Sequence, residues 1–147
     1  MDNNLKRSII LEHYQNPKNR GLVNDNGYKH INMNNESCID EIDLNIKIED
    51  GIVKDIHFDG EACAISTSST SIMINTLIGK TIDEALNIYN NFDAMIDERE
   101  YNKDVLEEAI VYDDICRQPN RKKCALLPWW GIKKALEEAK KQISKQQ

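Results

Sequence analysis

Residues 40–60, with the sequence DEIDLNIKIEDGIVKDIHFDG, decide the fold. From Ile42 to Ile48 every second residue is apolar and its neighbours are polar, which is the period-two pattern of a half-buried strand. Asp50-Gly51 is a two-residue hairpin signal, and apolar residues return between Ile52 and Phe58. A short third strand from Ala62 to Ile65 would complete a three-stranded antiparallel meander.

Helical patterns precede and follow this meander, so we predict an α+β fold. The residue before a proline is pushed out of the α region, so Asn16-Pro17 ends the first helix. Residues 24–37 are rich in asparagine and are expected to be irregular. A capping box begins one helix at Thr81. The helices are predicted at residues 2–15, 66–78, from 81 onward, 97–113, and after Pro128.

Length and charge restrict the class of protein. The chain has 147 residues and a mass of 16.9 kDa, so residues 1–147 are predicted to form a single domain. The formal net charge is −6, which argues against nucleic acid as a partner. The sequence contains neither an apolar run of membrane-spanning length nor a secretory signal, so we expect no membrane association and a cytoplasmic protein.

Four cysteines are the candidates for chemistry: Cys38, Cys63, Cys116 and Cys124. No two of them form a C-x-x-C pair, which excludes a zinc ribbon or a thioredoxin-type motif. In a chain that is not secreted, such cysteines are better interpreted as metal-binding or reactive thiols than as disulfides.

Three of the cysteines have surroundings that favour a thiolate or a metal. Cys63 precedes a predicted helix N-terminus, where free amides lower the pKa of a thiol, and Cys124 follows three basic residues. Cys38 has a carboxylate, Asp40, two residues downstream. Three thiolates and one carboxylate could close a tetrahedral zinc site. Buried single cysteines can also be simple small hydrophobic residues, and spacing alone leaves both interpretations open.

Several motifs, in order from about residue 5 to residue 140, resemble the U-type iron–sulfur cluster assembly family (IscU, the N-terminal domain of NifU, and SufU). Residues 13–21 match the family segment H-Y-x-N-P-x-N-x-G, and Cys38-Ile39-Asp40 lies where the family has C-G-D. Residues 60–69 match G-x-x-C-x-I-S-x-x-S. The resemblance implies the SufE/NifU-like (IscU-type) fold, a three-stranded antiparallel sheet packed with about five helices.

The third cysteine segment is most similar to the zinc-binding SufU subfamily. Residues 121–129 resemble its R-x-K-C-x-L-x-x-W segment. Scaffold-type members have a histidine directly before this cysteine, whereas this chain has Lys123. A helical insertion at about residues 93–115 is a second SufU-like feature.

The resemblance implies a sulfurtransferase-like sulfur carrier that acts in iron–sulfur cluster assembly. Zn²⁺ would be held by Cys38, Asp40, Cys63 and Cys124. Cys38 would accept persulfide sulfur from a SufS-like cysteine desulfurase, and downstream cluster assembly proteins would receive it. Two alternatives stay open: a scaffold that builds a [2Fe–2S] cluster on the same residues, or a purely structural zinc-binding interaction domain.

One residue departs from the family pattern. The family glycine between the first cysteine and the aspartate is Ile39 here. A β-branched residue restricts the backbone where glycine would leave it free, so we expect the loop of Cys38 to be stiffer. The departure leaves the implied ligand set unchanged.

The remaining chemically interesting side chains receive structural interpretations. His13 is expected to pack or to donate a hydrogen bond at the end of the first helix, with some share in function implied by its motif. His30 and His57 are expected to face solvent. Cys116 matches no family ligand and is interpreted as incidental. Trp129-Trp130 is interpreted as a core anchor.

Overall fold

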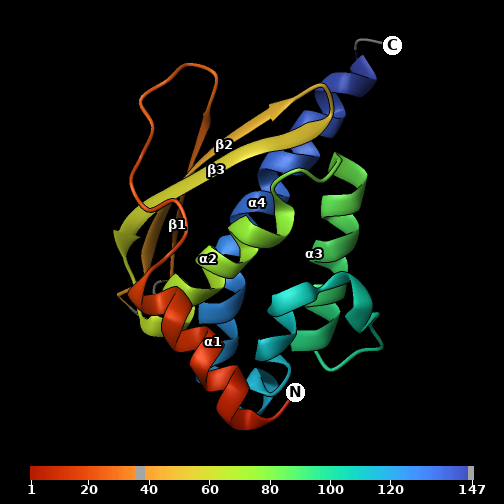
Figure 1. The fold of residues 1–147 in the computed structure, drawn as a ribbon. Helices are drawn as coiled ribbons and strands as arrows, with labels where there is room; N and C mark the ends of the chain where they lie inside the picture. Colours follow the sequence, from red (N-terminus) through yellow and green to blue (C-terminus); the bar gives the residue numbers. More distant parts are fainter. Residues whose placement is uncertain (36–38, 146–147) are drawn as a thin grey trace.

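The computed structural model describes residues 1–35 and 39–145 and has a sheet with helices packed against it (Figure 1). The elements in chain order are α1 (Asn3–Gln15), β1 (Lys29–Asn34), β2 (Glu41–Glu49), β3 (Ile52–Glu61), α2 (Ala64–Leu77), α3 (Ile82–Ile96), the short 3₁₀ helices η1 (Lys103–Val105), η2 (Glu107–Tyr112) and η3 (Ile115–Arg117), and α4 (Pro119–Lys145). The predicted α+β class with a three-stranded antiparallel sheet is confirmed.

The hairpin predicted from residues 40–60 forms the centre of the sheet. The strand order is β1-β2-β3, with both pairs antiparallel. Asp50 and Gly51 have φ values of 55° and 71°, which is the left-handed geometry that a tight two-residue hairpin turn requires. The alternating residues Ile42, Leu44 and Ile46 are all buried, so period-two alternation identified both the strand and its inner face.

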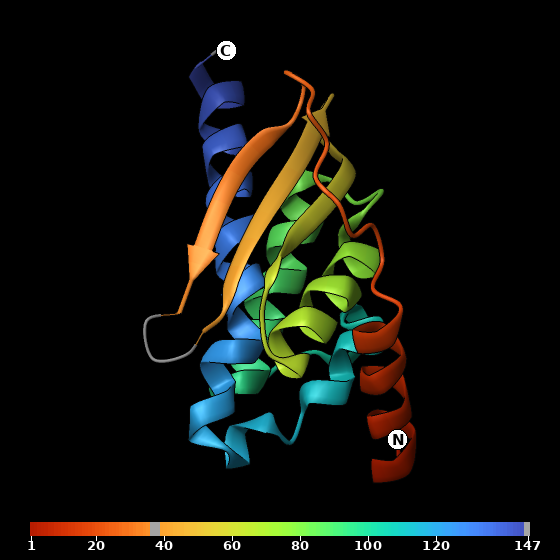
Figure 2. The ribbon, with the colours of Figure 1, turned by 90° about the vertical axis from the view of Figure 1, so that its left-hand side faces the viewer.

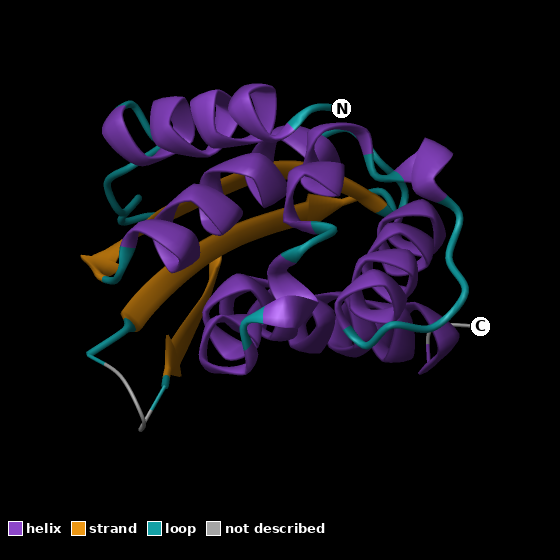
Figure 3. Cartoon of the chain, turned by 90° about the horizontal axis from the view of Figure 1, so that it is seen from below, coloured by secondary structure: helices purple, strands orange, loops and turns teal. Residues whose placement is uncertain are grey.

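Helices cover one face of the sheet. Helix α4 packs on β1 and β2, and α2 lies between α4 and α1 (Figures 1 and 3). The other face has no helix in front of it, and the segment that joins α1 to β1 runs beside β3 (Figure 2). In that segment the Gly21 amide donates to the Phe58 carbonyl oxygen at 2.7 Å. Under the helices, Trp129 is fully buried and stacks on Phe92 with 4.2 Å between ring centroids, which confirms Trp129 as a core anchor.

The third strand is not where the sequence predicted it. The strand expected at residues 62–65 is absent: Cys63 is the N-cap of α2, and the helix begins at Ala64. The strand is β1, which lies in the segment expected to be irregular. Its polar residues obscured the strand pattern. They are tolerated because β1 is an edge strand, and one of them, Asn32, donates to Asp43 of β2 at 2.9 Å.

Two predicted helices also differ from the structure. The helix expected at residues 97–113 is wrong: α3 ends at Ile96 and 3₁₀ helices follow, with Glu98 and Glu107 at positive φ, where a right-handed helix cannot continue. The last helix begins at Pro119 and not after Pro128, and Pro128 lies inside it. Cys124, which precedes the predicted helix, therefore lies within α4.

The end of β3 depends on one glycine. Gly60 has φ of +133°, and a Cβ there would lie 2.1 Å from the backbone oxygen of Glu41. Only a residue without a side chain allows β3 to approach β2 this closely. The approach brings the residues after β3 next to those before β2.

None of the described helices is long and apolar enough to cross a membrane.

Candidate metal centre

Asp40 is a buried carboxylate fixed by hydrogen bonds from the chain after β3. It lies directly before β2 and is 1% exposed. Its Oδ1 accepts a hydrogen bond from the Cys63 amide at 2.7 Å, and its Oδ2 accepts one from the Ser66 hydroxyl at 2.7 Å. A buried carboxylate with both oxygens bonded in this way is held in one orientation.

Cys63 is placed by the helix that follows it. As the N-cap of α2, it accepts a hydrogen bond on Sγ from the Ser66 amide at 3.4 Å. Its Sγ is 3.7 Å from Asp40 Oδ2. The free amides of a first helical turn favour negative charge, so this position suits a thiolate.

Cys124 enters the group from the interior of α4, and Pro128 explains how. In a regular helix the amide of residue 128 would donate to the carbonyl of Cys124, but proline has no amide hydrogen. The freed Cys124 carbonyl oxygen instead lies 2.9 Å from the Ser66 hydroxyl, in donating geometry. One turn further along α2, the Ser69 hydroxyl donates to the next carbonyl, that of Ala125, at 2.6 Å. The proline therefore connects α4 to α2 beside the thiol.

The structure thus brings together three of the four predicted ligands. One donor atom from each of Asp40, Cys63 and Cys124 lies within 4.8 Å of the other two. The fourth, Cys38, lies outside the described residues. Cys116 is not brought to this group: it lies in η3, and its Sγ is 3.7 Å from the Asp113 carbonyl oxygen.

The pKa values of Asp40 and Cys124 indicate that a bound cation would stabilise this group. Burial raises the pKa of the Asp40 carboxyl, but the hydrogen bonds from the Cys63 amide and the Ser66 hydroxyl outweigh burial, so the pKa lies below its ordinary value. Burial, followed by the neighbouring Cys63 and Asp40, raises the pKa of the Cys124 thiol to about 12. The protein alone therefore opposes ionisation of Cys124 next to an ionised Asp40.

A bound divalent cation would reverse that opposition, since a coordinated thiol is deprotonated outright. Thiolate sulfur is a soft ligand that selects zinc or an iron–sulfur cluster, whereas magnesium and calcium need oxygen ligands. The donor set of Asp40, Cys63 and Cys124 therefore fits zinc and fits iron–sulfur chemistry equally well.

Ser66 is the functional residue that sequence reasoning missed. It is fully buried, and its hydroxyl lies within hydrogen-bond distance of both Asp40 and the Cys124 carbonyl. A hydroxyl has one proton, and the shorter distance is to the Asp40 carboxylate. Two features of the sequence could have indicated it: Ser66 lies three residues after Cys63, and Pro128 lies four residues after Cys124.

The three histidines lie outside this group. His13 forms hydrogen bonds through Nδ1 with the Ser71 hydroxyl at 2.7 Å and through Nε2 with Glu108 at 3.3 Å, as its expected structural role requires. His30 lies in β1 with its side chain 57% exposed, beside Asp43. His57 lies between the buried Ile56 and Phe58 on β3, so it is on the opposite face of the sheet, where its side chain is 26% exposed and bonds to Asp55.

Sequence comparison relates the chain to proteins of iron–sulfur cluster assembly. Residues 5–145 match the family described as NifU-like N terminal domain. The chain is 37% identical over 133 residues to the zinc-dependent sulfurtransferase SufU of Bacillus subtilis, covering 90% of this chain and 89% of that protein. It is 35% identical over 136 residues to the iron–sulfur cluster assembly scaffold protein IscU of Thermotoga maritima, covering 92% of each.

Solved structures confirm the predicted fold. The putative iron–sulfur cluster assembly scaffold protein for the SUF system from Fervidobacterium islandicum superposes with a TM-score of 0.83 at 36% identity, covering 87% of this chain and 93% of that one. A NifU-like N-terminal structure from Brucella abortus has a TM-score of 0.78 at 21% identity, covering 88% and 92%, and this likeness concerns the fold alone.

Proposed function

This chain belongs to the family of NifU-like N-terminal domains, and we propose that it acts in iron–sulfur cluster assembly as a zinc-dependent acceptor and carrier of sulfur. The observation that supports this most directly is the group of Asp40, Cys63 and Cys124, whose donor atoms lie within 4.8 Å of one another. The similarity to a relative named a zinc-dependent sulfurtransferase favours zinc over a cluster, as does Lys123 in the position where scaffolds have a ligating histidine.

Two of the proposed zinc ligands, Cys63 and Cys124, would stay in place, whereas Cys38 would be able to leave the metal. Cys63 and Cys124 belong to α2 and α4, which are joined by Ser66 and Ser69, so both thiols are anchored by helices. Cys38 would be the fourth ligand, two residues before Asp40. Bound zinc would keep the thiols ionised at neutral pH, which makes them ready nucleophiles.

The proposed reaction is thiol exchange on a persulfide. The Cys38 thiolate attacks the terminal sulfur of a cysteine persulfide on the desulfurase and forms a new sulfur–sulfur bond. The bond between that sulfur and the desulfurase cysteine breaks, and the desulfurase cysteine leaves as a thiolate. No oxidant or reductant is needed, because the sulfane sulfur keeps its oxidation state. The carrier then holds the sulfur on Cys38 for the next assembly protein.

A pair of cysteine variants tests the acceptor assignment. Cys38→Ala should abolish both stimulation of the desulfurase and persulfide labelling of this chain, because it removes the attacking sulfur. Cys116→Ala is the matched control and should retain both, since Cys116 lies apart from the group of donor atoms. Peptide mass spectrometry after reaction with the desulfurase locates the sulfur. A persulfide on Cys63, Cys116 or Cys124 in the wild-type protein contradicts the proposal.

Metal analysis separates the carrier from the cluster scaffold. The native protein, purified without air, should contain about one zinc per chain and be colourless, because zinc has no visible absorption. A brown protein with two irons and two sulfides per chain would support the scaffold instead. A zinc protein whose thiols resist alkylation and which accepts no sulfur would be the structural domain.

A further inference from the structure

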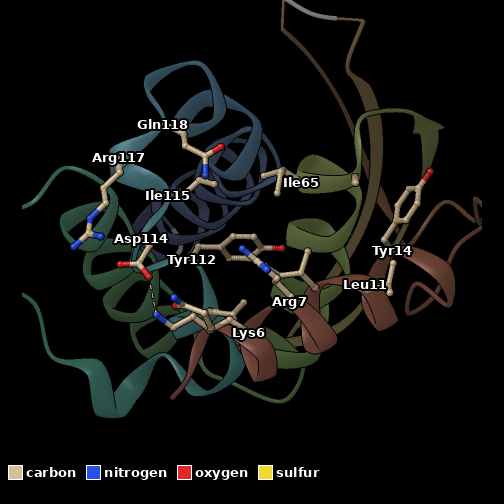
Figure 4. Close-up of a pocket in the computed structure, with 14 residues that line it drawn as sticks. Lys6, Arg7, Leu11, Tyr14, Ile65, Tyr112, Asp114, Ile115, Arg117 and Gln118 are labelled. Carbon is tan, nitrogen blue, oxygen red and sulfur yellow. Dashed lines mark hydrogen bonds and ion pairs between the residues drawn. The ribbon is translucent and has the colours of Figure 1, made fainter.

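A groove lies between α1 and the segment 111–118, and it is not used by the proposed sulfur transfer. Its volume is about 610 Å³, and its lining is mainly apolar (Figure 4). One wall is a single face of α1, formed by Asn3, Lys6, Arg7, Ile10, Leu11 and Tyr14. The opposite wall comes from residues 111–118, and the ring of Tyr112 lies across the middle. We refer to this feature as the α1 groove.

The apolar side chains of the α1 groove are unusually exposed. Leu11 is 51% exposed and Tyr14 is 44% exposed, although both are large and apolar. None of the residues of α1 is buried, so the helix uses only part of its apolar surface against the fold. Contiguous exposed apolar surface of this kind marks an interaction site.

The rim of the α1 groove has more cationic than anionic side chains, whereas the chain as a whole is acidic. Lys6 is paired with Asp113 and Asp114, at 2.6 and 2.9 Å. Arg7 and Arg117 are both exposed and form no ion pair within residues 1–35 and 39–145. The hydrogen bond from Lys6 has the larger effect in lowering the pKa of the Asp114 carboxyl, and Arg117, which lies near Asp114, helps to lower it. The formal charge of the chain is −6, and the guanidinium groups of Arg7 and Arg117 beside an apolar surface favour a partner with carboxylates.

The α1 groove adjoins the candidate metal centre. Ala64 and Ile65 line it, and they directly follow Cys63 in the first turn of α2. A protein that presents a persulfide to the metal centre would therefore cover the groove as well.

The shape of the groove indicates an elongated occupant. The lining positions on α1 extend from Asn3 to Tyr14, and a helix of that length spans about 17 Å. When a helix binds in a groove, apolar side chains spaced along one face of that helix contact the groove. A small molecule would leave the exposed Leu11 and Tyr14 at the far end of the groove uncovered.

We infer that the α1 groove is a docking site for a segment of the cysteine desulfurase that combines apolar anchors with carboxylates. This inference rests on the proposed function, since it names the surface through which the sulfur donor is bound. Arg7 and Arg117 would pair with the donor's carboxylates, while Leu11, Tyr14 and Ile65 would contact its apolar side chains. The groove binds the donor, and the thiols perform the transfer.

Charge reversal at the rim tests the docking site. The variant is Arg7→Glu/Arg117→Glu, and the control is Lys141→Glu/Lys145→Glu, which changes the net charge equally in the last turns of α4. All four side chains are exposed, so both variants should fold and bind zinc normally. Desulfurase turnover is measured against the concentration of each variant. The rim variant should need about tenfold more protein for half-saturation, with maximal turnover within about twofold of wild type.

A second variant examines the apolar part of the groove. Leu11→Ala/Tyr14→Ala should raise the half-saturating concentration as well, and this effect should persist at high salt, where the charge contribution is screened. A rim variant whose half-saturating concentration matches that of the lysine control would overturn the docking site while leaving the proposed function intact. A wild-type protein that accepts no sulfur at all would overturn the proposed function and, with it, the docking site.

Discussion

Helix α4 packs against two partners, and the two contacts have opposite chemistry. Its contact with the sheet, the apolar seam, is hydrocarbon: a Cβ at Gly131 would lie 2.8 Å from Leu44 Cδ1 and 2.9 Å from Met33 Cγ. Its contact with α2 includes polar groups that we call the polar seam: the Ser69 hydroxyl donates to the Ala125 carbonyl, and the Ser66 hydroxyl lies 2.9 Å from the Cys124 carbonyl oxygen. Both seams are buried, yet only the polar seam lies beside the candidate metal centre.

The difference shows how the fold separates stability from positioning. Burial of apolar surface is non-directional, so the apolar seam holds layers together without fixing where one thiol lies. Hydrogen bonds are directional, and buried polar groups are costly unless every one is satisfied. The hydroxyls of the polar seam meet that condition: no buried side-chain nitrogen or oxygen of the described residues lacks a partner. The polar seam therefore fixes the register of α2 against α4, and with it Cys63 against Cys124.

Metal removal should produce the largest effect, because the proposed ligands join distant segments at the polar seam. Unfolded chains have no preformed site, so metal binding adds to the free energy of unfolding. At a free zinc concentration a thousandfold above the dissociation constant, the contribution is about 4 kcal/mol. Chelation should therefore lower the melting temperature by about 10 °C, measured by calorimetry.

A ligand variant is the control for this experiment. Cys63→Ser/Cys124→Ser should melt at one temperature with and without chelator, because it has lost the site. Wild-type protein that melts unchanged after verified metal removal would show that Asp40, Cys63 and Cys124 do not form a metal centre.

Leu44→Ala should be the next largest change, and it acts on the apolar seam. Leu44 is fully buried under α4, and truncation of a buried leucine costs about 3 kcal/mol through lost burial and the cavity left behind. Denaturant unfolding measures the loss. The zinc content of the folded variant should stay at about one per chain, since Leu44 belongs to the apolar seam and takes no part in the hydrogen bonds of the polar seam. Loss of metal from a folded Leu44→Ala protein would mean that the two seams are not independent.

Ser66→Ala should have the reverse profile. The loss in unfolding free energy should be smaller, about 1–2 kcal/mol, because one buried hydrogen-bonding hydroxyl is removed. Zinc affinity, measured by competition with a chromophoric chelator, should fall about tenfold, because the partner that orients Asp40 is lost.

Ser68→Ala is the matched control for Ser66→Ala. Ser68 lies on the same helix and is equally buried, but its hydroxyl bonds to Tyr112 Oη at 2.5 Å instead of to the metal centre. It should lose comparable stability and keep its zinc affinity. Equal zinc affinities in the two variants would make Ser66 a structural residue only.

The same contrast explains what the sequence could predict. Alternation in residues 42–48 reports burial on one face, which is a local property, so the central hairpin was predictable. The capping box at Thr81 is also local, and it forms with Glu84 as predicted. The edge strand β1 was missed because its polar Asn32 is satisfied by side chains of β2, which are neighbours only in the folded protein.

The polar seam could not be derived from the sequence for the same reason. Pro128 was interpreted as the start of a helix, whereas it lies inside α4. It leaves the Cys124 carbonyl without an amide donor, and the residues around Pro128 do not show that Ser66 lies next to this carbonyl in the fold. Serine hydroxyls at the start of α2 have partners about 60 residues away in the chain, so no local pattern identifies them. The surroundings of the cysteines left a metal site and simple buried thiols both open, and the resemblance to a family favoured the metal site. The structure adds how three of the four predicted ligands are held.

Ile39→Gly should have the smallest effect on stability, because Ile39 belongs to neither the apolar seam nor the polar seam. Ile39 is 81% exposed, so its side chain contributes almost nothing to the core. Glycine adds backbone freedom mainly to the unfolded chain, and the loss in unfolding free energy should be about 0.5–1 kcal/mol. The same freedom should ease the movement of the neighbouring Cys38 during transfer, so single-turnover persulfide formation should become a few-fold faster, by less than about 1.4 kcal/mol in the barrier. Ile39→Val, which stays β-branched, is the control and should transfer sulfur at the wild-type rate. A glycine variant that transfers sulfur no faster than the valine variant would mean that backbone stiffness at residue 39 does not limit the reaction.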